Sequence, residues 1–296
     1  MGPGTWTRAF VTALAIAGAS AAQSQSPPAL PLQNLGLEHL DIIVPDTAAS
    51  AKFYMRVFKT RLHQQPVRDS LRYFVLLGDL PADRQVGYIA IGAAAPGRAP
   101  SIGHYCTLAK VYDRAGMAKQ LEAAGFPGIR GTGGLGMWPD PDGIELQLFQ
   151  PPAGLVTAAV PSTLDLQNDG LVTPIGVDHV MLLVNDVEKS LPYYRFVYGA
   201  GVEGRPSTAL GAGREGGRVW LNLEKSTRIG IEKAPDGMAR IGHYAIKVAP
   251  FDRSVVTARL QQLGATIVPS PDEPDVLRFT DDNGIVVELL QVTSNK

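Results

Sequence analysis

Four of the five histidines in this 296-residue chain occupy matching places in the sequence. His39 and His179 lie 140 positions apart, and His104 and His243 lie 139 apart. Each is in a short segment of apolar and β-branched residues, which predicts a β-strand. A buried imidazole needs a partner, and a local backbone group could be that partner. Four histidines at matched strand positions instead favour metal ligation.

Two glutamates in the second half of the chain strengthen this hypothesis. Glu232 ends the apolar segment 229–231, and Glu288 lies inside the apolar segment 286–290. Carboxylates are rarely buried unless they are paired or bind a metal. For Glu232 a solvated hairpin end is the alternative, since Lys233 follows it. Two imidazoles and two carboxylates suit Zn, Ni, Fe, Mn or Co. We therefore predict one divalent ion bound by His179, Glu232, His243 and Glu288.

The first half of the chain offers a weaker version of this site. At the repeat offset, Gln147 is the counterpart of Glu288, and Glu145 precedes it by two residues on the same face of the predicted strand. The strand that matches Glu232, residues 86–93, contains no acid. A second site would therefore have at most three ligands, which are His39, His104 and either Glu145 or Gln147.

The histidines belong to a duplication that covers most of the chain. Residues 102–105 (Ile-Gly-His-Tyr) recur as residues 241–244, and the acidic turn 140–143 recurs as 281–284. A nearly constant offset over separated blocks indicates two copies of one unit. The predicted boundaries are a first domain at 35–150, a linker at 151–174, a second domain at 175–292 and a tail at 293–296.

Each copy has the pattern of two β-α-β-β-β modules, which predicts an α+β fold. Residues 37–44 and 177–184 are predicted strands, and Asp46 and Asp186 are placed to cap the helices that follow them. Further strands are predicted at 72–77, 86–91, 103–111, 144–149, 218–223, 228–232, 242–248 and 285–292, and further helices at 115–124 and 254–263, ending at Gly125 and Gly264.

Composition excludes several classes of function. The formal net charge is -1, and the chain has no run of Lys and Arg, so we expect no binding to nucleic acid or to an anionic membrane. Cys106 is the only cysteine, which rules out an intramolecular disulfide and a thiolate-rich metal site.

The N-terminal residues have the order of a secretory signal peptide. Arg8 precedes the apolar run 9–17, and small residues follow at 18–22. We predict a signal peptide at 1–22, a flexible leader at 23–34, and an exported protein that does not stay on the membrane after cleavage. An uncleaved N-terminal anchor is the alternative.

These patterns together resemble the vicinal oxygen chelate superfamily of glyoxalases, epimerases, resistance proteins and extradiol dioxygenases. The resemblance rests on His39 and His179 before capped helices, on the Gly-His-Tyr strands, and on the acidic turns before the last strands. It implies four modules paired into two curved mixed-sheet cups that hold a divalent metal. It also implies a small-molecule substrate, while the oligomeric state stays open.

The resemblance leaves three functions open. We favour a glyoxalase- or epimerase-like lyase or isomerase, in which the metal chelates vicinal oxygens and Glu288 or Glu232 moves a proton. The second is an extradiol dioxygenase with Fe(II) on His179, His243 and Glu288. That second function is weakened because the second half has no third histidine and has Phe279 near where the family's tyrosine is expected. The third is a binding protein without catalysis, and its substrate cup would be lined by Trp220, Tyr244 and Phe279.

Overall fold

The fold is seen in a computed structural model that describes residues 29–67, 69–79, 86–128, 136–151, 159–166, 169–199, 214–215, 218–270 and 275–292. The predicted signal peptide and the predicted tail lie outside the described residues. Within the described part of the chain, no helix is both long and apolar enough to cross a membrane.

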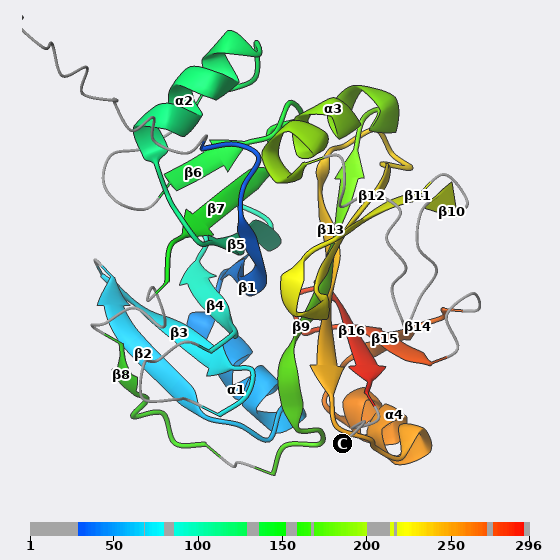
Figure 1. Cartoon of the computed structure of the whole chain (residues 1–296). Coiled ribbons are helices and arrows are strands. Elements are labelled where there is room, and N and C mark those ends of the chain that lie inside the picture. Colours follow the sequence, from blue (N-terminus) through cyan, green and yellow to red (C-terminus); the bar gives the residue numbers. More distant parts are fainter. Residues whose placement is uncertain are drawn as a thin grey trace, which may run out of the picture.

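Two mixed β-sheets of eight strands form the framework, one from each repeat (Figure 1). The strand orders are β6-β7-β5-β1-β4-β3-β2-β8 and β10-β11-β12-β9-β13-β16-β15-β14. In each sheet an antiparallel central pair, β1 with β5 or β9 with β13, joins two modules of the same chain. The predicted fold class is thereby confirmed, and the modules pair within one chain.

The first sheet comprises β1 (Asn34–Val44), β2 (Leu62–Val67), β3 (Ser70–Leu76), β4 (Tyr88–Ala93), β5 (Ser101–Ala109), β6 (Gly136–Pro139), β7 (Glu145–Phe149) and β8 (Val160–Pro161). The second comprises β9 (Pro174–Val184), β10 (Arg214–Glu215), β11 (Arg218–Asn222), β12 (Arg228–Lys233), β13 (Arg240–Val248), β14 (Thr266–Val268), β15 (Val276–Thr280) and β16 (Val286–Gln291).

The helices begin where the sequence places their caps. The Asp46 carboxylate accepts a hydrogen bond from the Ala49 amide at 2.9 Å, and the Asp186 carboxylate accepts from the amides of Glu188 and Lys189. These side chains satisfy amides that the first turn of a helix leaves free. The helices are α1 (Thr47–Val57), α2 (Arg114–Ala123), α3 (Val187–Tyr198) and α4 (Arg253–Gln262), with a short 3-10 turn, η2 (Glu224–Ser226).

In each sheet, successive side chains of a strand point alternately to an apolar face, which packs in the core, and to a face that carries polar residues. On β9, Val180 and Leu182 belong to one continuous hydrophobic core that also receives the helices and the first sheet. Met181 belongs to a separate small cluster on the opposite face. Since successive side chains of a strand point to opposite faces, His179 shares the face of Met181. The matched histidines therefore stand on the faces that point away from the common core.

The repeated acidic turns lock the two domains together. One oxygen of Asp140 accepts from the amide of Ile144 at 2.8 Å within its own turn, and its other oxygen accepts from the Tyr194 hydroxyl of α3 at 2.5 Å. Asp281 does the same with the amide of Ile285 and with the Tyr54 hydroxyl of α1, at 2.8 Å each. Each domain thus binds a helix of the other through the same turn.

Two segments outside the predicted domains pack onto the fold. Leu30 and Leu32 are buried, and the Leu32 amide donates to the Val197 carbonyl at 2.7 Å. The prediction of a flexible leader is therefore wrong for residues 29–34, because their leucines fill the core beside α3. Part of the predicted linker forms β8, which pairs with β2 and extends the first sheet.

Candidate functional site

Three of the four predicted ligands meet on the polar face of the second sheet. The Nε2 atoms of His179 and His243 are 3.4 Å apart, and the two Glu288 carboxylate oxygens lie 3.2 Å from His179 Nε2 and 3.3 Å from His243 Nε2. His179 comes from β9, His243 from β13 and Glu288 from β16, which are neighbouring strands. All three side chains are buried.

This spacing fits a divalent ion. Donors about 2.1 Å from a common ion in tetrahedral or octahedral geometry lie roughly 3.0–3.4 Å from one another. Glu288 Oε2 is buried and accepts no hydrogen bond of good geometry among the described residues, so a lone pair is available. Two imidazoles and one carboxylate form the facial triad that leaves open positions for other ligands. The donor set therefore fits Fe(II), Mn(II) or Zn(II).

A carboxylate and a buried arginine orient the first histidine. Asp178 Oδ2 lies 2.8 Å from His179 Nδ1 and also accepts from Arg228 at 2.6 Å. Burial opposes ionisation of Asp178, but the hydrogen bond to His179 and the Arg228 charge lower its pKa to about 2. An ionised Asp178 places the proton of His179 on Nδ1, so that Nε2 presents its lone pair to the site.

The protonation of the three donors follows from their surroundings. Burial lowers the pKa of His243 to about 3. Burial would lower the pKa of His179 as well, but contacts with Asp178 and Glu288 raise it. Burial would raise the pKa of Glu288, whereas His179, His243 and Arg278 together hold it well below its usual range. Arg278 Nε donates to Glu288 Oε1 at 2.6 Å. At neutral pH the site therefore contains a carboxylate and a neutral His243.

The predicted fourth ligand, Glu232, is not part of this cluster. In the parallel pairing of β9 with β12, His179 is opposite Arg228, and Glu232 is opposite Leu183. Four residues of strand separate Glu232 from the level of His179, about 13 Å along the strand. Its carboxylate accepts from Arg218 Nε at 2.9 Å instead. The ligand prediction is corrected to three residues, and an arginine occupies the place beside His179.

We call the face of the second sheet that carries His179, His243 and Glu288 the metal face. Of the three residues predicted to line a substrate cup, only Trp220 is on this face. Its ring packs edge-on against His179, with 5.0 Å between ring centroids, and the Arg228 guanidinium lies over the ring, 4.5 Å from its centroid. Tyr244 and Phe279 are directly adjacent to His243 and Arg278 in their strands, so they point to the opposite face. Both are buried in the common core, where Tyr244 donates to the Tyr54 hydroxyl. The cup prediction is wrong for these two.

The first sheet carries the matched cluster. His39 Nε2 and His104 Nε2 are 3.3 Å apart. Burial holds the pKa of His39 well below its usual value, and the nearby Gln147 side chain partly opposes this shift. Glu145 instead lies near the Tyr193 hydroxyl of α3 and helps to raise its pKa, after the larger effect of burial. Of the two alternatives for the third donor, the structure favours Gln147.

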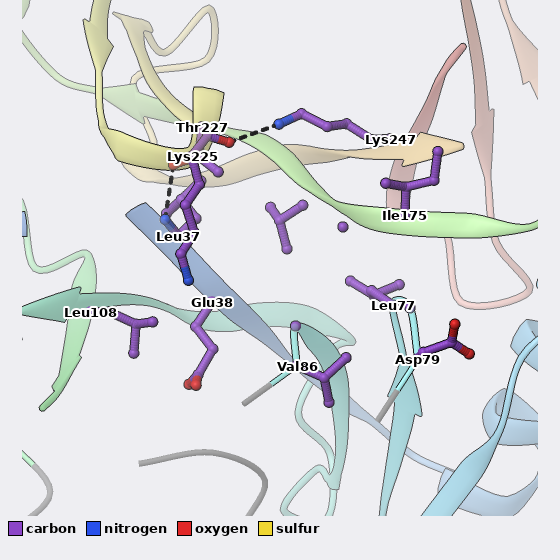
Figure 2. Close-up of a pocket in the computed structure, with 14 residues that line it drawn as sticks. Leu37, Glu38, Leu77, Asp79, Val86, Leu108, Ile175, Lys225, Thr227 and Lys247 are labelled. Carbon is purple, nitrogen blue, oxygen red and sulfur yellow. Dashed lines mark hydrogen bonds between the residues drawn. The ribbon is translucent and has the colours of Figure 1, made fainter. Parts of the chain in front are cut away.

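A cavity of about 350 Å³ lies between the domains, and its lining includes Glu38, whose carboxylate contacts His39. Figure 2 shows apolar side chains such as Leu77 and Val86 around it, with Lys247 extended toward the turn at Lys225 and Thr227. The Lys247 ammonium donates to the carbonyls of Lys225 and Ser226, at 3.2 and 2.8 Å. Because the Lys247 ammonium is already hydrogen-bonded to these carbonyls, the metal face is the better candidate for a catalytic site.

Three residues of the second site were missed by the sequence analysis, namely Asp178, Arg228 and Arg278. A signal for the first was present, because an acid directly precedes the histidine in both copies, as Glu38 and Asp178. Arg228 and Arg278 carried no such signal, since their roles depend on which strands become neighbours.

Fold and site together define a duplicated β-α-β-β-β metal-binding protein, and the comparison with known families agrees. The chain belongs to the Glyoxalase/Bleomycin resistance protein/Dioxygenase superfamily, whose family model matches residues 36–148 and 176–289. No curated protein matches the sequence significantly.

Solved structures with the same fold include dioxygenases and a glyoxalase. The 2,3-dioxygenase LapB from Pseudomonas sp. KL28 has a TM-score of 0.61 at 17% identity, over 88% of this chain and 93% of that one. A Mn(II)-bound glyoxalase from Novosphingobium aromaticivorans has a TM-score of 0.58 at 17% identity, over 88% and 83%. Homoprotocatechuate 2,3-dioxygenase from Brevibacterium fuscum, in complex with 3,4-dihydroxyphenylacetate, has a TM-score of 0.58 at 14% identity, over 91% and 89%. These likenesses show a shared two-domain fold.

Proposed function

We propose that this protein is an iron(II)-dependent dioxygenase of the extradiol type, acting on a small substrate with two vicinal hydroxyl groups. The observation that carries the proposal is the three-ligand site of His179, His243 and Glu288. Two histidines and one carboxylate with open positions are typical of non-haem iron oxygenases. This differs from the lyase or isomerase that the sequence favoured, because that hypothesis depended on Glu232 as a fourth ligand.

The residues around the triad support an anionic oxygen ligand. Arg228, Arg278 and Arg218 all lie on the metal face, paired with Asp178, Glu288 and Glu232. With the ion included, positive charge exceeds negative charge there, which favours an ionised hydroxyl of the substrate. When bound, iron(II) supplies the reactivity toward dioxygen that ring cleavage needs. Asp178 and Arg228 hold His179 in position, and Arg278 holds Glu288.

A non-oxidative lyase or isomerase is the second candidate. The face of the second sheet that carries the triad has no histidine other than the two ligands, so a third imidazole is missing there as acid or base for either function. Glu232 is the remaining carboxylate for proton transfer, and its side chain is 31% exposed beside Arg218. The fold shared with the Mn(II)-bound glyoxalase is compatible with this function.

Oxygen consumption separates the two candidates. The chain, loaded with Fe(II) without oxygen, is mixed with a panel of catechols in an oxygen electrode. We expect uptake with the wild type and with Glu232→Gln, and none with His243→Ala. The lyase or isomerase would be supported if no catechol caused oxygen uptake and the protein instead exchanged a carbon-bound proton next to a carbonyl. That proton exchange should be lost in Glu232→Gln. Ligand binding without either reaction would support a binding protein.

We also propose that the chain is exported. The proposal rests on the order of residues 1–22 in the sequence, with a basic start, an apolar run and small residues. N-terminal sequencing of the protein recovered from a bacterial periplasm should begin near Gln23. Recovery of an intact N-terminus from the cytoplasm would contradict export.

A further inference from the structure

We propose that the first domain binds a second divalent cation, held by His39, His104 and Gln147. The imidazoles come from the central strands β1 and β5, and Gln147 comes from β7, the strand next to β5. His39 is 3%, His104 8% and Gln147 7% exposed, so the cluster is nearly as buried as the triad of the second domain. The 3.3 Å between the two Nε2 atoms is within the range for donors that share one ion.

Both imidazoles are oriented by carboxylates on their far side. Glu38 Oε2 is 2.9 Å from His39 Nδ1, and Asp41 Oδ2 is 3.3 Å from His104 Nδ1. With these carboxylates ionised, each Nδ1 carries the proton, and each Nε2 presents a lone pair. Two lone pairs 3.3 Å apart in a buried place repel each other unless a cation lies between them. A divalent ion satisfies both at once.

The third donor is a neutral amide in the first domain and a carboxylate in the second, and the residue opposite each donor in the sheet matches its charge. Gln147 is opposite Met137 in the pairing of β7 with β6, whereas Glu288 is opposite Arg278 in the pairing of β16 with β15. The anionic ligand has a cationic neighbour, and the neutral amide has an apolar one. The first site thus has two imidazoles and an amide oxygen, which suit Zn(II) or Ni(II) and bind more weakly than the second triad.

Another donor set is geometrically available nearby. Glu38, His39 and Cys106 are buried and have potential ligand atoms within 4.8 Å of one another. This set would use the carboxylate that now orients His39 Nδ1, and it would leave the facing Nε2 atoms unsatisfied. We therefore assign the ion to the Nε2 side, and Cys106 serves to test the assignment.

Metal counting tests the proposal without any enzymatic assay. The chelator-treated full chain is dialysed against Zn(II), and bound zinc is measured by plasma mass spectrometry. We expect two ions per chain in the wild type, and one in either His104→Gln or His243→Gln. His63→Gln is the matched control, because His63 is a buried strand histidine outside both clusters, and it should retain two. One ion in the wild type, or two in His104→Gln, would overturn the proposal.

Two further variants keep the test independent of any loss of folding. Glu38→Gln should weaken the weaker of two zinc affinities by about 10–100-fold, as expected for loss of a carboxylate that orients a ligand, and leave the tighter affinity unchanged. Cys106→Ser should keep both ions. Unchanged affinities in Glu38→Gln, or an ion lost in Cys106→Ser, would contradict the assignment. These counts do not depend on the proposed dioxygenase activity.

Discussion

Each arginine on the metal face of the second sheet is paired with one carboxylate. Arg228 pairs with Asp178 at 2.6 Å, and Arg278 pairs with Glu288 at 2.5 Å. A buried charge without a partner is strongly destabilising, so these pairs allow Glu288 to stay ionised in the interior. The site is therefore prepared for a cation before any ion enters.

The two glutamates predicted as ligands should behave differently when their charge is removed. Loss of a residue that only orients a metal ligand lowers metal affinity by roughly 10–100-fold. Glu288→Gln removes a ligand itself, so it should lower the affinity for Fe(II) or Zn(II) by at least that much. Glu232→Gln should change the affinity little, since that carboxylate contacts Arg218 rather than the triad. Competition with a fluorescent zinc chelator measures both variants. Equal losses would restore Glu232 as a ligand.

Metal affinity should depend on pH through one proton. In the metal-free protein the pKa of His179 is raised, so acidification protonates His179 first, and a protonated imidazole cannot bind a metal. His243, with its pKa lowered to about 3, stays neutral, and Glu288, with its lowered pKa, stays ionised. Below the pKa of His179, the affinity of the second-domain ion should fall about tenfold per pH unit. Zinc titrations of His104→Gln between pH 5 and 8 measure this slope; a hundredfold fall per unit would indicate two protons.

At the scale of elements, hydrophobic periodicity and helix caps were enough to predict the helices, whereas the register between strands could not be predicted. Helices α2 and α4 lie within one residue of their predicted ranges, 115–124 and 254–263, because Gly125 and Gly264 mark where they end. Helices α1 and α3 begin directly after their predicted caps, Asp46 and Asp186. Strands β2, β6, β8, β10, β14 and β15 were not predicted from the sequence. Glu232 was misplaced because its distance from His179 depends on how β12 pairs with β9, which is a non-local contact. Tyr244 was misplaced because its neighbour His243 took the polar face.

The hydroxyl of Tyr194 on α3 should contribute measurably to stability. It donates to buried Asp140 of the other domain, so Tyr194→Phe leaves a buried carboxylate oxygen without its donor and should cost about 1–3 kcal/mol. Tyr193→Phe is the matched control on the same helix, because the Tyr193 hydroxyl is buried and has no hydrogen-bond partner among the described residues. Urea denaturation should show a loss only for Tyr194→Phe. Equal effects would mean that this contact between domains is energetically unimportant.

At the scale of the whole molecule, the two domains also meet where β1 approaches the turn at η2. The Leu37 amide of β1 donates to the Thr227 hydroxyl at 2.9 Å, which brings the start of the first sheet against the turn at η2. Gly36 makes this approach feasible, since a Cβ placed there would be 2.5 Å from the Glu224 carbonyl oxygen. Its φ of 94° is also a conformation that favours glycine.

Substituting this glycine should therefore weaken the docking of the domains. Gly97 is the matched control, because its φ is 77° and a Cβ there would meet nothing within 4 Å. Gly97→Ala should lower the free energy of unfolding by about 1–2 kcal/mol, the cost of a left-handed backbone with a side chain. Gly36→Ala should lower it by a further 1–3 kcal/mol or so, because the carbonyl of Glu224 must move. Urea denaturation of both variants measures the difference. Equal losses would show that the contact at Gly36 can shift freely.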